Sequence, residues 1–187
     1  MSQREEVDRQ RIEQFLSALG RRFTRPGRIY LVGGTTLVWE RLRSQTIDID
    51  LTYDVSPEDT GEFTRTIQAL KRELAINVEE VSPGDFIPLP AGYRERSLFI
   101  GRFGSLEVFH FDLYSTALSK IERGRDEDLS DVLTLLKTSR IDMAQLAACF
   151  EDILPRVETH SLKGDPIEFS RKFEMLRLMW RETSKSG

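Results

Sequence analysis

The chain has 187 residues, which suits one compact domain or one domain with a helical appendage. Hydrophobic residues make up 39% of it and charged residues 31%, so it can bury a core and lacks the composition of a disordered, collagen-like or coiled-coil protein. The formal net charge of -4 disfavours non-specific attraction to nucleic acid and leaves local basic patches as the route to binding RNA.

The start of the sequence, the single cysteine and the two histidines argue against further classes of protein and of metal site. The first residues are charged and no apolar core follows them, so we expect no signal peptide, and no run approaches the roughly 20 apolar residues that span a bilayer. The single Cys149 lies in an apolar run and is expected to be buried and inert. With only His110 and His160 besides, a zinc site is not expected. We expect a cytoplasmic protein.

The predicted elements begin with a mixed region of helices and strands and end with helices alone. We predict helices ending at Gly20 and over 35–42, 56–74, 115–121, 129–136, 141–154 and 167–181, strands over 29–32, 46–53, 77–81, 96–100 and 106–113, and a long loop over 82–94. This order predicts the α+β class, with a mixed β-sheet flanked by helices. Residues 1–113 would form the α/β core with its N-terminal helix, and residues 114–187 a helical part packed on it.

The segment 46–53 alternates strictly between apolar and polar residues. Ile47, Ile49, Leu51 and Tyr53 point one way, and Thr46, Asp48, Asp50 and Thr52 point the other. The two aspartates therefore share one face of the predicted strand, about 6–7 Å apart along it. Convergent carboxylates of this kind suit Mg²⁺ and the oxygens of a triphosphate.

A glycine pair precedes this strand and ends the strand 29–32. Gly33 and Gly34 tolerate positive φ and let the backbone approach a ligand, and the helix that follows offers unpaired N–H groups to a phosphate. The Thr35 hydroxyl can add a hydrogen bond. Each feature alone is weak, because a glycine pair is usually only a turn and Asp48 with Asp50 usually only a polar strand face.

In this order, the two features resemble the polymerase-β superfamily of nucleotidyltransferases, whose signature is a glycine pair followed by Asp-x-Asp. The resemblance implies Mg²⁺ as cofactor, a nucleoside triphosphate (NTP) as substrate and a third carboxylate from a later strand. Two candidates lie in the segment 106–113. Glu107 shares a face with Phe109 and Phe111, which suggests core, so we favour Asp112, which shares a face with His110. The alternative is that Asp112 only ends the strand or caps the next helix.

A second block resembles AbiEii-type nucleotidyltransferases, the branch that includes MenT-like toxins and small uncharacterised proteins. Its pattern is a helix with Lys120, Arg123 and Arg125, followed by Asp128-Leu-Ser-Asp131, with valine in place of the family's final leucine. The resemblance implies that Lys120 contacts nucleotide phosphates and that Asp128 or Asp131 supports the site. The alternatives are a surface lysine and a solvated helix start.

The resemblance implies transfer of a nucleotide from an NTP to RNA or protein, with tRNA as acceptor in the toxin-like subclass and an antitoxin protein as partner. Basic residues offer an acceptor surface: Arg21, Arg22, Arg25, Arg28, Lys71, Arg72, Arg94 and Arg96. The competing interpretation is a catalytically decayed module that binds nucleotides without transfer. A hydrolase is not expected, because the sequence has no Gly-x-Ser-x-Gly and no usable Cys–His pairing.

Overall fold

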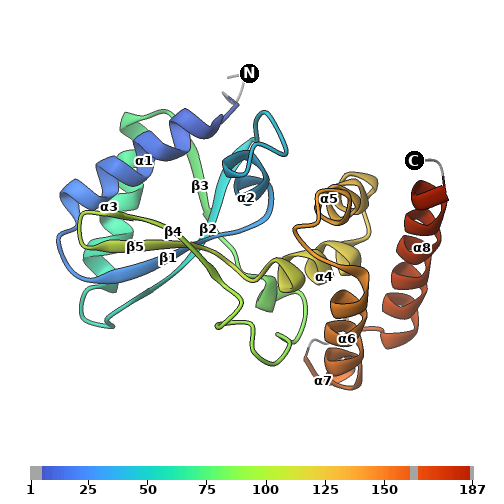
Figure 1. The fold of residues 1–187 in the computed structure, drawn as a ribbon. Coiled ribbons are helices and arrows are strands. Elements are labelled where there is room, and N and C mark those ends of the chain that lie inside the picture. Colours follow the sequence, from blue (N-terminus) through green and yellow to red (C-terminus); the bar gives the residue numbers. More distant parts are fainter. Residues whose placement is uncertain (1–5, 161–163, 186–187) are drawn as a thin grey trace. The chain divides into compact units, whose positions relative to one another are not determined.

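The computed structural model describes residues 6–160 and 164–185. The strands are β1 (Gly27–Leu31), β2 (Asp48–Val55), β3 (Asn77–Glu80), β4 (Leu98–Phe103) and β5 (Leu106–His110). The helices are α1 (Arg9–Arg22), α2 (Gly33–Trp39), α3 (Thr60–Glu73), α4 (Leu113–Arg123), α5 (Asp126–Lys137), α6 (Met143–Ile153), α7 (Val157–His160) and α8 (Pro166–Lys185), with 3-10 turns η1 (Pro83–Asp85) and η2 (Leu154–Arg156). All five strands precede α4 (Figure 1), which confirms the predicted α+β class.

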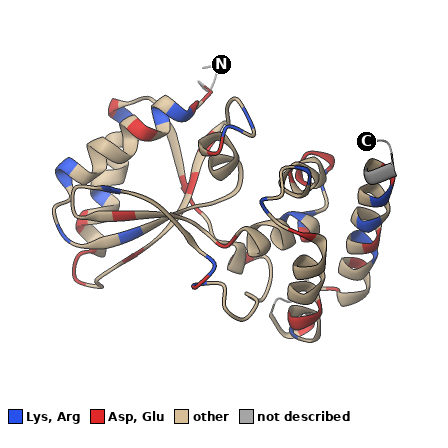
Figure 2. Ribbon diagram, viewed as in Figure 1, with Lys and Arg blue, Asp and Glu red and all other residues tan. Residues whose placement is uncertain are grey.

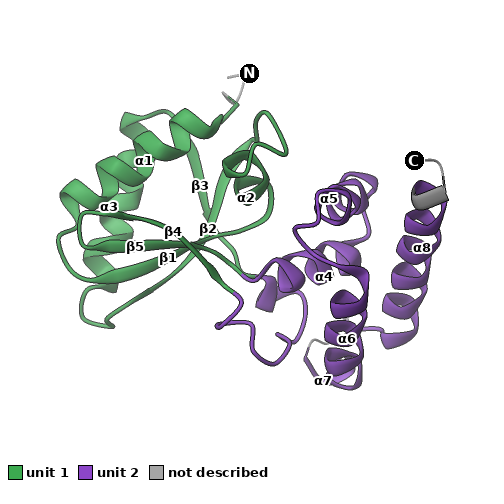
Figure 3. Ribbon diagram, viewed as in Figure 1, with its two compact units in different colours: residues 1–82, 97–111 green, residues 83–96, 112–187 purple. Residues whose placement is uncertain are grey.

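The chain divides into two compact units (Figure 3). Unit 1 comprises residues 1–82 and 97–111, and unit 2 comprises residues 83–96 and 112–187. The sequence predicted a single division after residue 113. The structure instead groups 83–96 with the helices that follow β5, a grouping that the order of elements along the chain does not reveal.

Unit 1 is built on a five-stranded mixed sheet in the order β3-β2-β1-β5-β4. The central strand β1 pairs antiparallel with β2 and parallel with β5. The strand β2 also pairs parallel with β3, and β4 pairs antiparallel with β5 at the opposite edge. The aspartate strand β2 therefore lies between β1 and β3, and a side chain from either neighbour can join its polar face.

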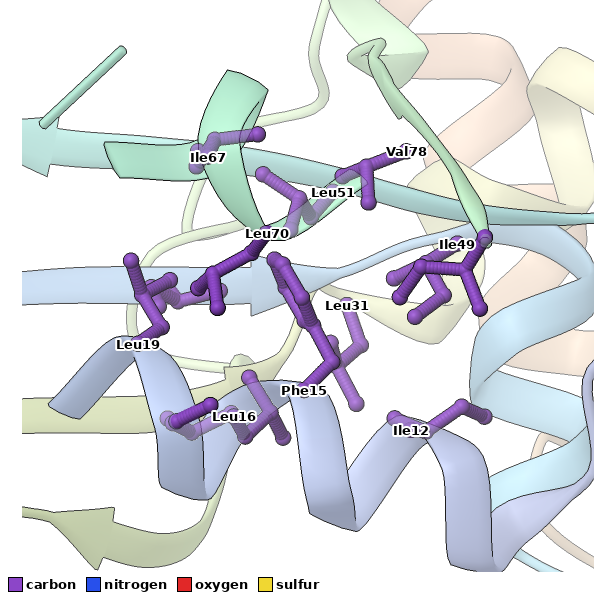
Figure 4. Packing of buried hydrophobic residues seen from close by; sticks show 14 of the residues in the cluster. Ile12, Phe15, Leu16, Leu19, Leu31, Ile49, Leu51, Ile67, Leu70 and Val78 are labelled. Atoms are coloured by element: carbon purple, nitrogen blue, oxygen red, sulfur yellow. The ribbon is translucent and has the colours of Figure 1, made fainter. Parts of the chain in front are cut away.

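The core of unit 1 lies between this sheet and helices α1 and α3. Figure 4 shows side chains of α1, such as Phe15 and Leu16, packed against Leu31 of β1 and the apolar residues of β2. Ile49 and Leu51 of β2 are fully buried in this cluster or nearly so, at 0% and 1% exposure. Because successive side chains of a strand point to opposite faces, Asp48 and Asp50 point away from the core.

Two details of the predicted strand and the helix after it were wrong. The strand was predicted over 46–53 with Ile47 on its apolar face, but β2 begins at Asp48 and Ile47 is 55% exposed. The helix predicted from Ser56 begins instead at Thr60. The Ser56 hydroxyl donates to Asp59 in a turn before the helix, so this residue shapes the entry to α3 without being its N-cap.

Unit 2 contains helices α4 to α8 and the long segment 83–96. Contacts within the unit hold the segment: Ala91 N–H donates to Asp152, Arg156 donates to the Leu89 carbonyl, His160 hydrogen-bonds the Gly84 carbonyl, and Arg96 donates to Asp112. The predicted loop is therefore an anchored segment that carries the short turn η1. Cys149 is buried, as expected. None of the helices within the described residues has the length and apolar character needed to cross a bilayer.

Candidate active site

The carboxylates of Asp48 and Asp50 lie at the start of β2, on the sheet face opposite α1 and α3. Both residues are partly exposed, and the buried Ile49 between them fixes the strand's orientation. The structure thus places the predicted pair on one face, as the alternating pattern required. This pair is the starting point of the candidate site.

The glycine turn and Thr35 hold this pair in place. Gly33 has φ +58, and a Cβ at this position would lie 3.0 Å from Asp50 Oδ2, so a side chain here would be strained and would press on the carboxylate. The Thr35 hydroxyl accepts a 2.8 Å hydrogen bond from the Asp50 N–H and lies 3.4 Å from the Asp48 carbonyl. Thr35 is fully buried, so it contributes by positioning the two aspartates. Its hydroxyl is not exposed to a phosphate, which was the contact predicted for it. Gly34 packs equally closely, since its Cβ would lie 2.7 Å from Thr46 Oγ1.

The strand β3 adds an acid that the sequence analysis missed. Glu79 is the register partner of Asp50, and Asn77 is the partner of Asp48. The Asn77 amide donates to Asp48 Oδ1 at 2.8 Å and to Glu79 Oε1 at 2.9 Å, so all these side chains share one face. We call Asp48, Asp50, Asn77 and Glu79 the acid face. Alternation within 77–81 was the available signal, but only the parallel pairing of β3 with β2 brings Glu79 beside Asp50.

The loop after α2 carries a cation next to the glycine turn. Arg43 Nη1 lies 3.4 Å from where a Cβ of Gly34 would stand. Figure 2 shows basic residues in this loop, and Arg41 and Arg43 line a cavity of about 570 Å³ together with Arg9 and residues of α1 and α2. Asp8 and Glu13 also line this cavity, so its lining carries carboxylates as well as guanidinium groups.

The face of β5 that packs against the core is the opposite of the face that was predicted to do so. Leu106 and Val108 are fully buried in the core of unit 1, whereas Phe109 lies on the face of the aspartates. The premise that favoured Asp112 over Glu107 was therefore wrong. Glu107 does lie on the acid-face side, but Arg28 and Arg102 pair with it, and the hydrogen bond from Arg102 lowers the pKa of its carboxyl.

Asp112 is the N-cap of α4. It is 0% exposed, and Arg96 grips it with two hydrogen bonds, Nε to Oδ1 at 3.0 Å and Nη2 to Oδ2 at 2.9 Å. Tyr114 N–H, Ser115 N–H and the Ser115 hydroxyl also donate to its oxygens. Arg96 donates to the Asp112 carboxylate, and this hydrogen bond raises the pKa of Arg96. These contacts match the capping alternative, and α4 begins at Leu113, two residues before the predicted start of the helix.

His110 is a satisfied buried residue, as the sequence suggested. Its Nε2 lies 2.8 Å from Glu40 Oε1 and its Nδ1 lies 3.3 Å from the Thr36 hydroxyl. It has 1% exposure and lies on the core face of β5, so it has the environment of a structural side chain.

The residues of the second motif block meet inside unit 2. The Lys120 ammonium lies 3.1 Å from Asp128 Oδ1 and 2.7 Å from Asp131 Oδ2, and Arg123 also pairs with Asp128. Lys120, Asp128 and Asp131 are all buried. The sequence thus grouped these residues correctly, and their charges balance one another within the helices. Contact of Lys120 with phosphate stays a prediction.

Some of the arginines proposed as an acceptor surface have acidic partners. Arg22 makes a bidentate pair with Glu73, Arg28 pairs with Glu107, and Arg96 pairs with the buried Asp112. The hydrogen bond that Arg22 donates to the Glu73 carboxylate raises the pKa of Arg22. These arginines pair with carboxylates of their own units. Fewer unneutralised positive charges therefore remain for an RNA acceptor than the sequence alone suggested.

The donor set of the acid face suits a hard cation. Carboxylate and amide oxygens are the ligands that Mg²⁺ prefers, and this ion usually takes one or two protein carboxylates and completes its shell with phosphate oxygens and water. Within the described ranges 6–160 and 164–185, no three His, Cys, Asp or Glu side chains are arranged to hold a metal by themselves. Asp48 and Asp50 would therefore share a metal with the substrate.

Comparison with known proteins gives one match. The model of the family described as "Nucleotidyltransferase of unknown function (DUF6036)" matches residues 10–177. No curated protein and no solved structure matched the chain. The matched range spans both units and includes the glycine turn, the acid face and the buried charges of unit 2.

Proposed function

The chain belongs to this family of nucleotidyltransferases of unknown function, and from that premise we propose that it transfers a nucleotide from an NTP to RNA with the help of Mg²⁺. The observation that carries the proposal is the acid face, where Asp48 and Asp50 stand together against the Gly33 turn. The motif blocks further favour the AbiEii-type branch, whose toxin-like subclass implies tRNA as acceptor and an antitoxin protein as partner.

In the proposed reaction, the oxygen of an acceptor hydroxyl forms a bond to the α-phosphorus of the NTP. The bond from that phosphorus to its bridging oxygen breaks, and pyrophosphate leaves with the electron pair. The hydroxyl proton passes to a carboxylate of the acid face. Bound Mg²⁺ would supply neutralisation of triphosphate charge and activation of the hydroxyl. Asp48 and Asp50 orient these groups, because the Thr35 hydroxyl and the buried Ile49 hold their backbone.

We assign the third carboxylate of this site to Glu79. Its register with Asp50 and the shared hydrogen bonds of Asn77 support this assignment. Asp112 is the weaker candidate, because every carboxylate oxygen there already accepts hydrogen bonds from Arg96 and the start of α4. Glu79 is exposed and can turn toward a metal by exchanging its bond to Asn77 for a metal bond.

The test is incubation with each α-labelled NTP, MgCl₂ and total RNA. We compare the wild type with Asp48→Asn and with Asp54→Asn, which changes an exposed acid on the same strand and face. We expect labelled RNA with the wild type and with Asp54→Asn, and none with Asp48→Asn or in EDTA. Label on the protein in place of RNA would make a protein the acceptor.

Two results would contradict the proposal. Transfer that survives in Asp48→Asn would remove the acid face from the reaction. Magnesium-dependent NTP binding by the wild type without transfer to any acceptor would favour the decayed nucleotide-binding module.

A further inference from the structure

A row of register partners crosses the sheet of unit 1 next to the acid face. Thr52 of β2 pairs with Tyr30 of β1, Tyr30 pairs with Phe109 of β5, and Phe109 pairs with Phe99 of β4. Register partners on adjacent strands point to the same face, and strands are spaced about 4.8 Å apart. Three aromatic side chains and one small one therefore stand in line on the face that carries Asp48 and Asp50.

Each ring of this row contacts the next one. The Tyr30 and Phe109 rings are 5.4 Å apart and 26° from parallel, and Phe99 meets Phe109 edge-on at 5.4 Å. Phe111 contacts Tyr30 edge-on at 5.9 Å. Tyr30 is thus held in orientation by Phe109 on one ring face and by the edge contact with Phe111.

The second face of the Tyr30 ring lies toward β2, where its register partner is Thr52. A threonine side chain is short, so it leaves room beside a ring that stands up from the neighbouring strand. Thr52 is partly exposed and follows Asp50 by two residues on the same face, about 7 Å along the strand. The space beside Tyr30 is therefore next to the carboxylates, at a separation that the ribose of a nucleotide spans.

We propose that the Tyr30 and Thr52 end of this row is the nucleobase subsite of the chain: the base of the incoming NTP stacks on Tyr30 above Thr52 while its phosphates meet the acid face. The base would extend the series Phe99, Phe109, Tyr30 by one more ring. Stacking on aromatic side chains accepts every base, because each base has a π-face. The subsite rests on the proposed function, since it places the base of the same NTP.

The test measures binding, so it does not depend on knowing the acceptor. Titration calorimetry with Mg·ATP, Mg·CTP and Mg·tripolyphosphate separates the base from the phosphates. We expect Tyr30→Leu to weaken both nucleotides about tenfold or more and to leave tripolyphosphate unchanged. Tyr30→Phe keeps the ring and should bind like the wild type. Phe99→Leu is the matched control, because it removes the ring at the far end of the row.

A second variant covers the case in which Tyr30→Leu does not fold. Thr52→Phe places a ring where the base would stack, so it should block both nucleotides and spare tripolyphosphate. The subsite is overturned if nucleotide affinity survives in Tyr30→Leu or Thr52→Phe, or if tripolyphosphate affinity falls in parallel. A wild type that binds none of the three ligands would overturn the proposed function and the subsite together, whereas a wild type that binds tripolyphosphate as tightly as ATP would overturn the subsite alone.

Discussion

Substitution of Asp112 by asparagine separates a capping role from a metal-binding role. Asparagine has almost the same size, but it replaces one carboxylate oxygen with an N–H donor. In the wild type, the donors around this carboxylate are Arg96 Nε at 3.0 Å, Arg96 Nη2 at 2.9 Å, Tyr114 N at 3.3 Å, Ser115 N at 3.2 Å and Ser115 Oγ at 2.6 Å. The new amide would face some of these donors, and the Arg96 charge would lose its partner.

The size of the effect follows from the burial of the pair. Breaking a buried ion pair typically costs about 3–5 kcal/mol. The Arg96 side chain keeps 25% exposure against 0% for Asp112, so water can partly replace the lost partner. We therefore expect Asp112→Asn to lower the free energy of unfolding by about 2–4 kcal/mol. For a chain of this length, that corresponds to a fall in melting temperature of about 4–16 °C.

The assay has two parts. Urea unfolding is monitored by circular dichroism, and Mg·ATP is titrated at a temperature where the variant is folded. A capping role predicts lower stability and near-normal Mg·ATP affinity. The double variant Arg96→Met/Asp112→Asn should lose less than the sum of the single variants, because the two side chains act as one unit. Wild-type stability together with lost Mg·ATP binding in Asp112→Asn would refute the capping argument and restore Asp112 as the third metal ligand.

Three further substitutions test the acid face and its supports. Glu79→Gln should lower magnesium-dependent transfer about 10–100-fold with little change in unfolding free energy, because this residue is exposed; full activity in a transfer assay would exclude it as the third carboxylate. Thr35→Val leaves the N–H of Asp50 without its partner and should cost about 1–3 kcal/mol in urea unfolding, whereas Thr134→Val on α5 should unfold like the wild type; equal unfolding curves would contradict this. Gly33→Ala forces a left-handed φ on alanine and should cost about 1–2 kcal/mol and weaken Mg·ATP in calorimetry; unchanged affinity would show that the Asp50 carboxylate does not depend on this turn.

Local sequence patterns determined the parts of this protein that depend on neighbours in the chain. The alternation in 46–53 was enough to place Asp48 and Asp50 on one face, because the side chains of a strand alternate whatever its partners are. The glycine pair was enough to predict a turn with unusual φ before the helix, since few other residues adopt that conformation without strain. The resemblance to AbiEii-type proteins, and not a local pattern, grouped Lys120 with Asp128 and Asp131, which do meet in the structure.

Tertiary structure decided which strands lie side by side and which face each one buries. Glu79 joins Asp50 because β3 pairs with β2, and the segment 77–81 alone contains no information about that partner. The face of β5 was predicted wrongly, because Phe109 and Val108 are both apolar and only the position of α1 and α3 determines which of them is buried. Asp112 lies between a strand and a helix, where either role is consistent with the local pattern. Arg96 lies in the segment 83–96, which belongs to unit 2, and its two hydrogen bonds to Asp112 assign Asp112 to the helix cap.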